Sequence, residues 1–510
     1  MTVKTMVRVS VCLLIAMLAT ACGSGNEPVR VTIPATQIGA GAPIYTATPS
    51  LTPSRTPIPS ATFTPTHTAT VTPTASDTPT ATATPTFTAT PTNTSTETAS
   101  PTPTTELLTL TPISLEGAPP AIAVASAELS PDFTGGWSCR DFPCADDIDG
   151  FLSRIRVPDG FEVSHAGTFP GQVQQIVVGD DGRIYGTVLE NGTRSGAVYV
   201  IDEATSDAQR YSDTIISPHG LAFQPSTNVL YVTGRITLEN DGALFRVTAS
   251  GETTPIINDL PCCFQIVRNQ PNGIIFGADG LLYMGVGAVT DRAESTNPAR
   301  QAFADVLPNE ASILRVNPHT GTIETVAQGT HNPYDLTFTS NGTLYGTDMG
   351  LVTGEGDRLL RITEGAHYGW PYYRTRGCAE CPPRPAQLDI QPDTYLFPNY
   401  TLPRGIVAYT GTQFPANFQN TLFITLWNET TWGQRVIWLN PNDERLTSED
   451  FVPDVFMDGL VRPSDVTLAP DGSLLVVDHV NGNVWRVSYT AEVTQPTPSG
   501  FVFPTNTPAN

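Results

Sequence analysis

One pattern constrains the fold of this chain more than any other: a two-strand unit recurs six times between about Phe161 and Val487. Each copy is a short β-rich run, an Asp-Gly, Asn-Gly or equivalent turn, and a second β-rich run. Asp-Gly and Asn-Gly between alternating apolar runs are strong hairpin signals. The copies are QIVVGDDGRIYGTV (175–188), GLAFQPSTNVLYVTG (220–234), GIIFGADGLLYMGVG (273–287), DLTFTSNGTLYGTDMG (335–350), GIVAYTGTQFPANFQNTLFITLW (405–427) and DVTLAPDGSLLVVDHV (465–480).

Most copies are followed by a third β-rich run that ends in a basic residue plus Val or Ile. These runs are GALFRV (242–247), SILRV (312–316), RLLRI (358–362) and NVWRV (483–487). A strand-only unit that repeats every ~50 residues, with no helical stripe between copies, is typical of a propeller blade. The pattern therefore predicts an all-β fold, a six-bladed β-propeller over residues 131–489, with an array of all-β sandwiches as the alternative.

The start of the chain has the layout of an export signal. After two basic residues, Val9–Leu18 forms an apolar run too short to span a membrane stably, and small residues follow it. This layout resembles a bacterial lipoprotein signal peptide at residues 1–21, in which Cys22 becomes the lipid-carrying N-terminus. We expect an exported protein, lipid-anchored to the outer face of the bacterial membrane at the cell surface. Ordinary secretion with cleavage near Ala21 is the alternative.

A low-complexity segment follows the signal. Residues 46–106 hold 25 Thr and 11 Pro in 61 positions, with no apolar period and almost no charge. Such a composition cannot bury enough surface to offset the loss of backbone entropy. We therefore expect residues 22–130 to be a disordered Thr/Pro-rich stalk that holds the propeller away from the membrane. Residues 490–510 have a similar composition and are expected to be a disordered tail.

Charge excludes several classes of function. The net charge is −23 and the pI is near 4.5, so nucleic acid and anionic lipid headgroups are poor partners. The chain has a single lysine, Lys4, which lies in the signal peptide. The mature protein therefore has no lysine for a Schiff base, for a phosphate-binding loop or for proton abstraction.

Six cysteines lie beyond Cys12 and Cys22, in three close pairs, and outside the cytosol they are expected to oxidise. Proximity suggests three short-loop disulfides, but the sequence leaves the connectivity open. The pairs are Cys139/Cys144, Cys262/Cys263 and Cys378/Cys381.

Polar residues recur just before or at the start of the six inner strands, which surround one end of the central channel of a propeller. They are Gln172, Gln174, His219, Asn269, Asn272, His331, Asn332, Arg404 and Arg462. A ring of amides, imidazoles and guanidiniums suits an anionic or polyhydroxylated ligand. The alternative for each residue is that it only satisfies backbone groups in the loops that line the channel.

These residues resemble a known family, the glucose/sorbosone dehydrogenases, over most of residues 161–487. The most specific pieces are GIIFGADGLLYMGVG, SILRVNPHTG (312–321), HNPYDLTFTSNGTLYGTDMG (331–350), DRLLRITEGAHYGWP (357–371) and RPSDVTLAPDGSLLVVD (462–478). The resemblance implies a six-bladed propeller that uses pyrroloquinoline quinone (PQQ) and calcium to oxidise a carbohydrate and passes the electrons to an external acceptor.

The resemblance also implies roles for particular residues. Gln172 occupies the place of a substrate-contacting glutamine, and Gln174 lies beside it. The expected PQQ-binding residues are Asn269, Asn332, Arg404 and Arg462. The expected calcium ligands are the carbonyls of Gly350 and Leu351 at one site, and Asp357 with the carbonyl of Tyr368 at another.

The chain departs from the family at the position of the general base. Relatives have a histidine before the third inner strand, which takes the proton of the C1 hydroxyl while hydride moves to the quinone. Asn269 stands there in this chain, and an amide cannot take that proton. His219 and His331 are the candidate substitute catalytic bases. Glu429 lies near where relatives have an arginine.

Three functions remain open from the sequence. The first is a PQQ-dependent sugar dehydrogenase that has moved its base. The second is a non-catalytic surface propeller that binds a glycan or a protein. The third is another propeller enzyme, such as a lactonase with a central calcium, which would need acidic residues at the inner-strand ends, where amides, His and Arg predominate.

Replacing Cys22 by Ser should leave export intact and release the protein from the membrane, because a serine cannot carry the thioether-linked lipid. Fractionation and labelled-palmitate incorporation would measure this, with Cys12→Ser as the matched control inside the signal. A Cys22→Ser protein that stays in the membrane fraction would refute lipidation at this residue.

Overall fold

The computed structural model describes residue 143 and residues 146–190, 194–238, 241–262, 270–293, 306–350, 356–372, 381–428, 432–448 and 450–490. The predicted signal, stalk and tail lie outside these ranges, as does Cys22. In the described ranges the chain forms one α-helix, α2 (Ile148–Arg154), two short 3-10 helices, η2 (Ala416–Phe418) and η3 (Glu444–Thr447), and strands β1 to β25. None of the described helices is long and apolar enough to cross a membrane.

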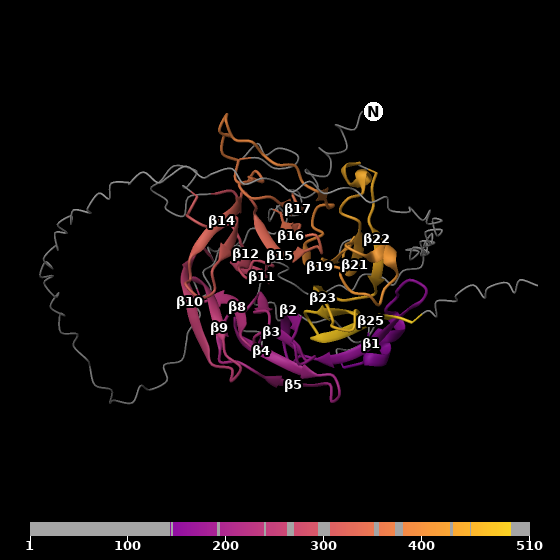
Figure 1. Ribbon diagram of the computed structural model, residues 1–510. Coiled ribbons are helices and arrows are strands. Elements are labelled where there is room, and N and C mark those ends of the chain that lie inside the picture. Colours follow the sequence, from indigo (N-terminus) through magenta and orange to yellow (C-terminus); the bar gives the residue numbers. More distant parts are fainter. Residues whose placement is uncertain are drawn as a thin grey trace, which may run out of the picture. The chain divides into compact units, whose positions relative to one another are not determined.

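The strands form six blades around a central axis (Figure 1). In chain order, from the axis outward, the first three blades are β2 (Gln172–Val178), β3 (Ile184–Leu189), β4 (Ser195–Asp202) and β5 (Asp207–Arg210); β7 (Leu221–Phe223), β8 (Leu230–Arg235), β9 (Gly242–Val247) and β10 (Thr253–Leu260); and β11 (Pro271–Phe276), β12 (Leu282–Val286), β13 (Ser312–Val316) and β14 (Ile323–Gln328).

The other three blades follow the same order, except that the last takes its outer strand from the start of the domain. They are β15 (Asn332–Phe338), β16 (Leu344–Met349), β17 (Arg358–Ile362) and β18 (Tyr395–Leu396); β19 (Pro403–Ala408), β20 (Leu422–Leu426), β21 (Arg435–Leu439) and β22 (Asp454–Asp458); and β23 (Pro463–Leu468), β24 (Leu474–Asp478), β25 (Asn483–Tyr489) and β1 (Phe161–Thr168).

The predicted all-β, six-bladed propeller is therefore confirmed. Each of the six sequence copies supplies the first two strands of a blade, and the four basic-ended runs are third strands. One feature was not predicted: the short strand β6 (Ile215–Ile216) pairs with both β4 and β8, which joins the first two blades into one nine-stranded sheet.

The ring is closed by β1, which pairs antiparallel with β25 from Phe161↔Tyr489 to Thr168↔Asn483. The helix α2 precedes it; the Asp147 side chain caps its N-terminus by accepting from the Gly150 N–H at 2.9 Å. The helix buries Phe151 against Trp485 of β25, with ring centroids 6.0 Å apart. The first elements of the propeller, α2 and β1, therefore pack and pair with its last strand, β25.

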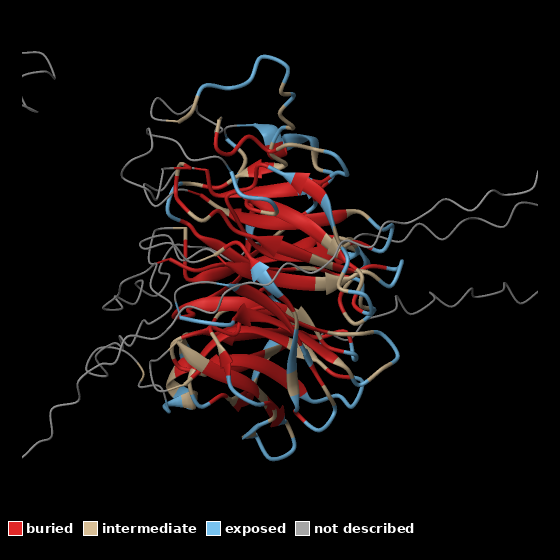
Figure 2. Cartoon of the chain, turned by 90° about the vertical axis from the view of Figure 1, so that its left-hand side faces the viewer, coloured by how far each residue is buried: buried red, intermediate tan, exposed pale blue. Residues whose placement is uncertain are grey.

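Burial follows the distance from the axis (Figure 2). Strands near the axis are almost wholly buried, as in β3, whereas outer strands such as β10 alternate buried and exposed residues. Apolar side chains fill the spaces between adjacent blades, for example Phe423, Phe456 and Trp485 in the cluster between the last two blades. The side chains nearest the axis are therefore mostly polar.

The inner strands are bulged, and side chains from neighbouring blades satisfy the displaced backbone groups. Register shifts interrupt the pairing of β2, β11, β15, β19 and β23 with their second strands. A threonine on the second strand reaches the next blade: the hydroxyl of Thr187 donates to the His219 carbonyl at 2.5 Å, and that of Thr347 to the Arg404 carbonyl at 2.5 Å. These bonds fix where the inner strands begin.

Two buried aspartates make similar bonds deeper in the channel. Asp335 on β15 accepts from the Ile406 N–H of β19 at 2.9 Å, and Asp465 on β23 accepts from the Ile176 N–H of β2 at 2.7 Å. The second bond joins the last blade to the first. A glycine makes room for each carboxylate; at Gly405, an added Cβ would lie 2.2 Å from the Asp465 Oδ1 atom.

We expect Asp335 to make stability depend on pH. Burial raises the pKa of Asp335 to about 7, above the roughly 3.9 of an unfolded aspartate. The folded chain then holds a proton that the unfolded chain releases, so its contribution to stability is complete below pH ~4 and is lost as the pH rises through about 7. Urea unfolding of the Asp335→Asn variant should show a smaller fall in unfolding free energy between those values.

The matched control is Asp259→Asn, at an exposed position of β10. An Asp335→Asn profile that runs parallel to the wild-type profile over this range would contradict the raised pKa.

Candidate functional site

The openings of the inner strands gather most of the predicted polar residues at one end of the channel. Since adjacent inner strands lie side by side around the axis, their first residues face a common space. The residues predicted there that are buried in the structure are Gln172, Gln174, His219, Asn272, His331, Asn332, Arg404 and Arg462. Asn269 and Glu429 lie outside the described residues.

Five of the channel side chains form one continuous stack, which we call the Arg404 cluster: His219, Tyr334, Arg404, Trp427 and His479. The Arg404 guanidinium lies 3.2 Å from the Trp427 ring centroid and 5.0 Å from that of Tyr334. The Tyr334 ring meets His219 edge-on at 4.6 Å, and the Trp427 ring meets His479 at 4.7 Å. A guanidinium between two aromatic faces is held by cation–π attraction.

His219 is neutral in this environment. Burial, followed by the nearby Arg404 charge, lowers the pKa of His219 to about 3. Its Nδ1 atom is buried and has no hydrogen-bond partner in the described part of the chain. It can therefore accept a hydrogen bond from a ligand, although it binds a proton weakly at neutral pH.

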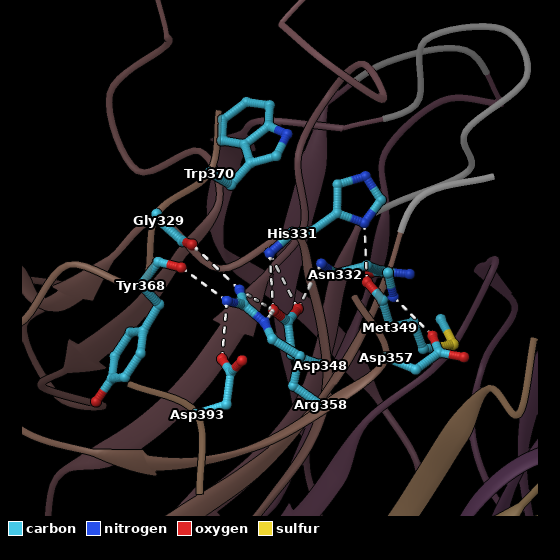
Figure 3. A network of polar contacts seen from close by, with 12 residues as sticks. Gly329, His331, Asn332, Asp348, Met349, Asp357, Arg358, Tyr368, Trp370 and Asp393 are labelled. Atoms are coloured by element: carbon cyan, nitrogen blue, oxygen red, sulfur yellow. Dashed lines mark hydrogen bonds and ion pairs between the residues drawn. The ribbon is translucent and has the colours of Figure 1, made fainter. Parts of the chain in front are cut away.

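One ring nitrogen of His331 is hydrogen-bonded (Figure 3). Since a carbonyl can only accept, Nδ1 donates to the Met349 carbonyl at 2.8 Å. The other nitrogen, Nε2, lies 3.2 Å from the Asp291 Oδ1 atom. The Asp291 carbonyl in turn accepts from the Trp370 indole at 2.9 Å. The His331 ring is thus fixed through Nδ1, whereas Nε2 has no hydrogen-bond partner among the described residues.

A buried ion network positions His331 and Asn332 (Figure 3). Their backbone N–H groups donate to the Asp348 carboxylate, at 3.0 Å and 2.7 Å to Oδ1. The Arg358 guanidinium pairs with the same carboxylate at 2.7 Å and with Asp393 at 3.2 Å. The first residues of β15 are therefore fixed by side chains of β16 and β17.

The last blade repeats part of this arrangement. The Asp478 carboxylate, at the end of β24, accepts from the backbone N–H groups of Val461, at 3.0 Å, and Arg462. The Arg462 guanidinium donates to Asn428 Oδ1 at 2.8 Å and to the Trp427 carbonyl at 3.3 Å. Arg462 is thereby fixed on the channel side of the loop.

The second predicted calcium site, Asp357 with the Tyr368 carbonyl, does not fit a cation. Both oxygens of Asp357 accept backbone N–H groups, from Gly350 at 2.8 Å and from Leu402 at 3.0 Å. The Tyr368 carbonyl accepts from the Arg358 guanidinium at 2.7 Å, so a positive charge already occupies it. Leu351 lies outside the described residues. No group of three or more His, Cys, Asp or Glu side chains in the described ranges could hold a metal ion.

Sequence reasoning missed Tyr334, Trp427 and His479. A signal existed for two of them. In the last three blades, Pro333, Pro403 and Pro463 of the inner strands pair with Asp348, Leu426 and Asp478 of the second strands. The residues that follow these partners are Met349, Trp427 and His479. An alignment of the repeats at their strand ends therefore places Trp427 and His479 at one position of the blade, beside the channel. The cysteine prediction is supported in part, because Cys262 and Cys381 are both disulfide-bonded.

Comparisons with known proteins agree with this fold. Residues 265–486, which span the last four blades, match the family model described as Glucose / Sorbosone dehydrogenase. An uncharacterized protein of Borreliella burgdorferi is 29% identical over 202 residues, covering 35% of this chain. The match spans about half the length of that relative, 52%.

A solved structure shows the same fold. A glucose dehydrogenase structure is 13% identical, with a TM-score of 0.50 over 64% of this chain and 99% of its own. The PQQ-bound form of an aldose sugar dehydrogenase from Streptomyces coelicolor is 17% identical, with a TM-score of 0.48 over 65% of this chain and 99% of its own.

Fold and site together define a sugar-dehydrogenase-like propeller with an oxidoreductase fold. Residues 265–486 match the family model of the glucose/sorbosone dehydrogenases, which supports the resemblance inferred from the blade motifs.

Replacing Arg358 by Leu should destabilise the protein by about 3–5 kcal/mol, because it leaves the buried Asp348 and Asp393 carboxylates without their cation. The matched control is Arg315→Leu, whose partner Glu324 is 59% exposed, and it should cost less than about 1 kcal/mol. Urea unfolding would measure both. Equal losses in the two variants would contradict the role given to the Arg358 network.

Proposed function

We propose that this protein is a PQQ-dependent oxidoreductase, exported and tethered to the membrane through Cys22, that oxidises an aldose or related alcohol. Electrons would pass to an external acceptor. One observation carries the proposal: a chain with the family's blades gathers cations and unpaired polar atoms at the channel end where the inner strands open. The stalk would hold the propeller away from the membrane, within reach of both substrate and acceptor.

The residues at the channel fit a carboxylated, planar cofactor. Arg404 and Arg462 bring two positive charges to the opening, and Asn332 lies on the same side at the start of β15. The buried Nε2 of Gln174 and Nε of Arg404 have no acceptor among the described residues, so a ligand rich in oxygen would satisfy them. PQQ, when bound, supplies a quinone that takes up the hydride of the substrate. Calcium at Asp357 and Tyr368 is not part of the proposal, because their oxygens already accept N–H groups. Calcium on the carbonyls of Gly350 and Leu351 stays a prediction.

The chain's own residues would accept the proton, position the loop and bind the sugar. His219 Nδ1 and His331 Nε2 are both buried without a hydrogen-bond partner among the described residues. His219 is the favoured proton acceptor, because the Asp291 carboxylate lies 3.2 Å from His331 Nε2, on the side from which a substrate hydroxyl would approach that nitrogen. His331 then acts as a positioning residue that fixes the loop before Asn332. Gln172 and Gln174 present unpaired amide atoms for hydroxyl groups of the sugar. The buried channel excludes water from this set.

A non-catalytic surface propeller is the second candidate. It is favoured by the same histidines: burial lowers the pKa of His219 to about 3, so it is a weak base, and Asn269 replaces the base that relatives have. In that case the channel would bind a glycan or a protein segment without turnover.

The test is a titration of the purified full chain with PQQ, followed by addition of aldoses and a dye acceptor. We expect stoichiometric binding and sugar-dependent reduction. His219→Ala should lower the rate by about 10²–10⁴-fold, the range of general-base catalysis, while PQQ binding persists. His319→Ala, at an exposed turn, is the matched control.

Two outcomes would overturn parts of this assignment. Full activity in both His219→Ala and His331→Ala would refute the substitute base. A chain that binds no PQQ would refute the dehydrogenase and leave the binding propeller.

A further inference from the structure

Arg404 is a buried cation that forms no ion pair with a carboxylate among the described residues. The residue is 9% exposed, and its guanidinium lies against the rings of Trp427 and Tyr334, with the Tyr334 side chain as a hydrogen-bond partner. Among the described residues no carboxylate pairs with it, and its Nε has no acceptor. Burial lowers the pKa of Arg404 to about 10, so it stays charged at neutral pH. An uncompensated charge in such a position is costly unless a ligand completes it.

The surroundings add no negative charge to offset it. Asp335 and Asp465 are bonded to backbone N–H groups, and burial raises the pKa of both, so the pair favours its protonated forms. Burial and the Arg404 charge lower the pKa of His219 and His479 to about 3, which keeps both rings neutral. The Arg404 cluster is therefore positive overall.

The atoms without a hydrogen-bond partner in the Arg404 cluster and in the neighbouring Gln174 are mostly donors. Arg404 Nε, Trp427 Nε1 and Gln174 Nε2 are buried N–H groups with no acceptor in the described part of the chain. An arginine or indole nitrogen can only donate. The group that would satisfy them carries several acceptor oxygens and a negative charge, as a carboxylate does.

We propose that the substrate of this site carries a carboxylate, which Arg404 receives, so that the preferred ligand is a sugar acid of the uronate class and not a neutral sugar. This rests on the proposed function, since it names the substrate class of the same channel. The Trp427 indole and the Gln174 amide would donate to the remaining oxygens.

The contacts of Arg404 favour the substrate as the source of the carboxylate over the cofactor. Tyr334, which packs on Arg404, also donates to the Gln174 carbonyl at 3.4 Å and packs on His219. Gln174 and His219 are the residues expected to meet the sugar. Asn332 and Arg462, which like Arg404 are expected to hold PQQ, have side-chain partners in the protein: Asn332 Oδ1 accepts from Asn272 at 2.6 Å, and Arg462 donates to Asn428.

The test compares binding of D-glucuronate and D-glucose to the purified full chain by calorimetry. We expect glucuronate to bind at least about tenfold more tightly, as a charge-assisted hydrogen bond allows. Arg404→Gln should remove this preference, Arg404→Lys should keep part of it, and Arg315→Gln, on the exposed surface, should keep all of it. The wild-type comparison needs no variant, so equal affinity for the two sugars overturns the proposal even if a variant does not fold.

Titration of the same proteins with PQQ separates this proposal from the proposed function. If the wild type binds PQQ but does not distinguish the sugars, the substrate class is wrong and the dehydrogenase stands. If it binds glucuronate through Arg404 but no PQQ, the dehydrogenase fails and the carboxylate site stands. If Arg404→Gln loses PQQ and leaves the sugar preference unchanged, the guanidinium serves the cofactor and the proposal is overturned.

Discussion

The hydrogen bonds between the bulged inner strands are the constraint on which the rest of this structure depends. Each bulge turns backbone groups away from their own blade, and a side chain of a neighbouring blade must satisfy them. Thr187 and Thr347 do so from second strands, while Asp335 and Asp465 do so from within the channel. Because Asp465 accepts from the Ile176 N–H of the first blade, these side-chain hydrogen bonds also help to close the ring.

This construction gives the channel its chemistry. Polar groups are buried at the axis because the apolar side chains fill the spaces between blades, and low solvent exposure then changes how the polar groups behave. Burial lowers the pKa of His219, and the Arg404 guanidinium lies against the rings of Trp427 and Tyr334 with no carboxylate beside it among the described residues. The second ion network, around Arg358, lies behind the opening and fixes the loop of His331 without entering the channel.

Much of the fold followed from the sequence, and much of the site did not. Asp-Gly and Asn-Gly turns between alternating runs are local signals, so the hairpins, the third strands and the number of blades could be predicted. The joining strand β6 could not, because two residues carry no period. Gln172, Gln174, His219 and Arg404 were predicted from their places before inner strands. The surroundings of the His331 ring, with Nδ1 bonded to the Met349 carbonyl and Nε2 beside the Asp291 carboxylate, depended on residues distant in the sequence.

The sequence by itself determined the blade, its number of copies and the type of residue at each inner-strand opening, because these depend on short-range patterns and their repetition. Only the tertiary structure decided which groups these side chains contact. It set Arg404 between Trp427 and Tyr334, gave the oxygens of Asp357 to backbone N–H groups in place of a cation, and left Gln174 unpaired. Charge, pKa and unpaired donors arise from what surrounds a side chain, and in a propeller those surroundings come from blades that are far apart along the chain.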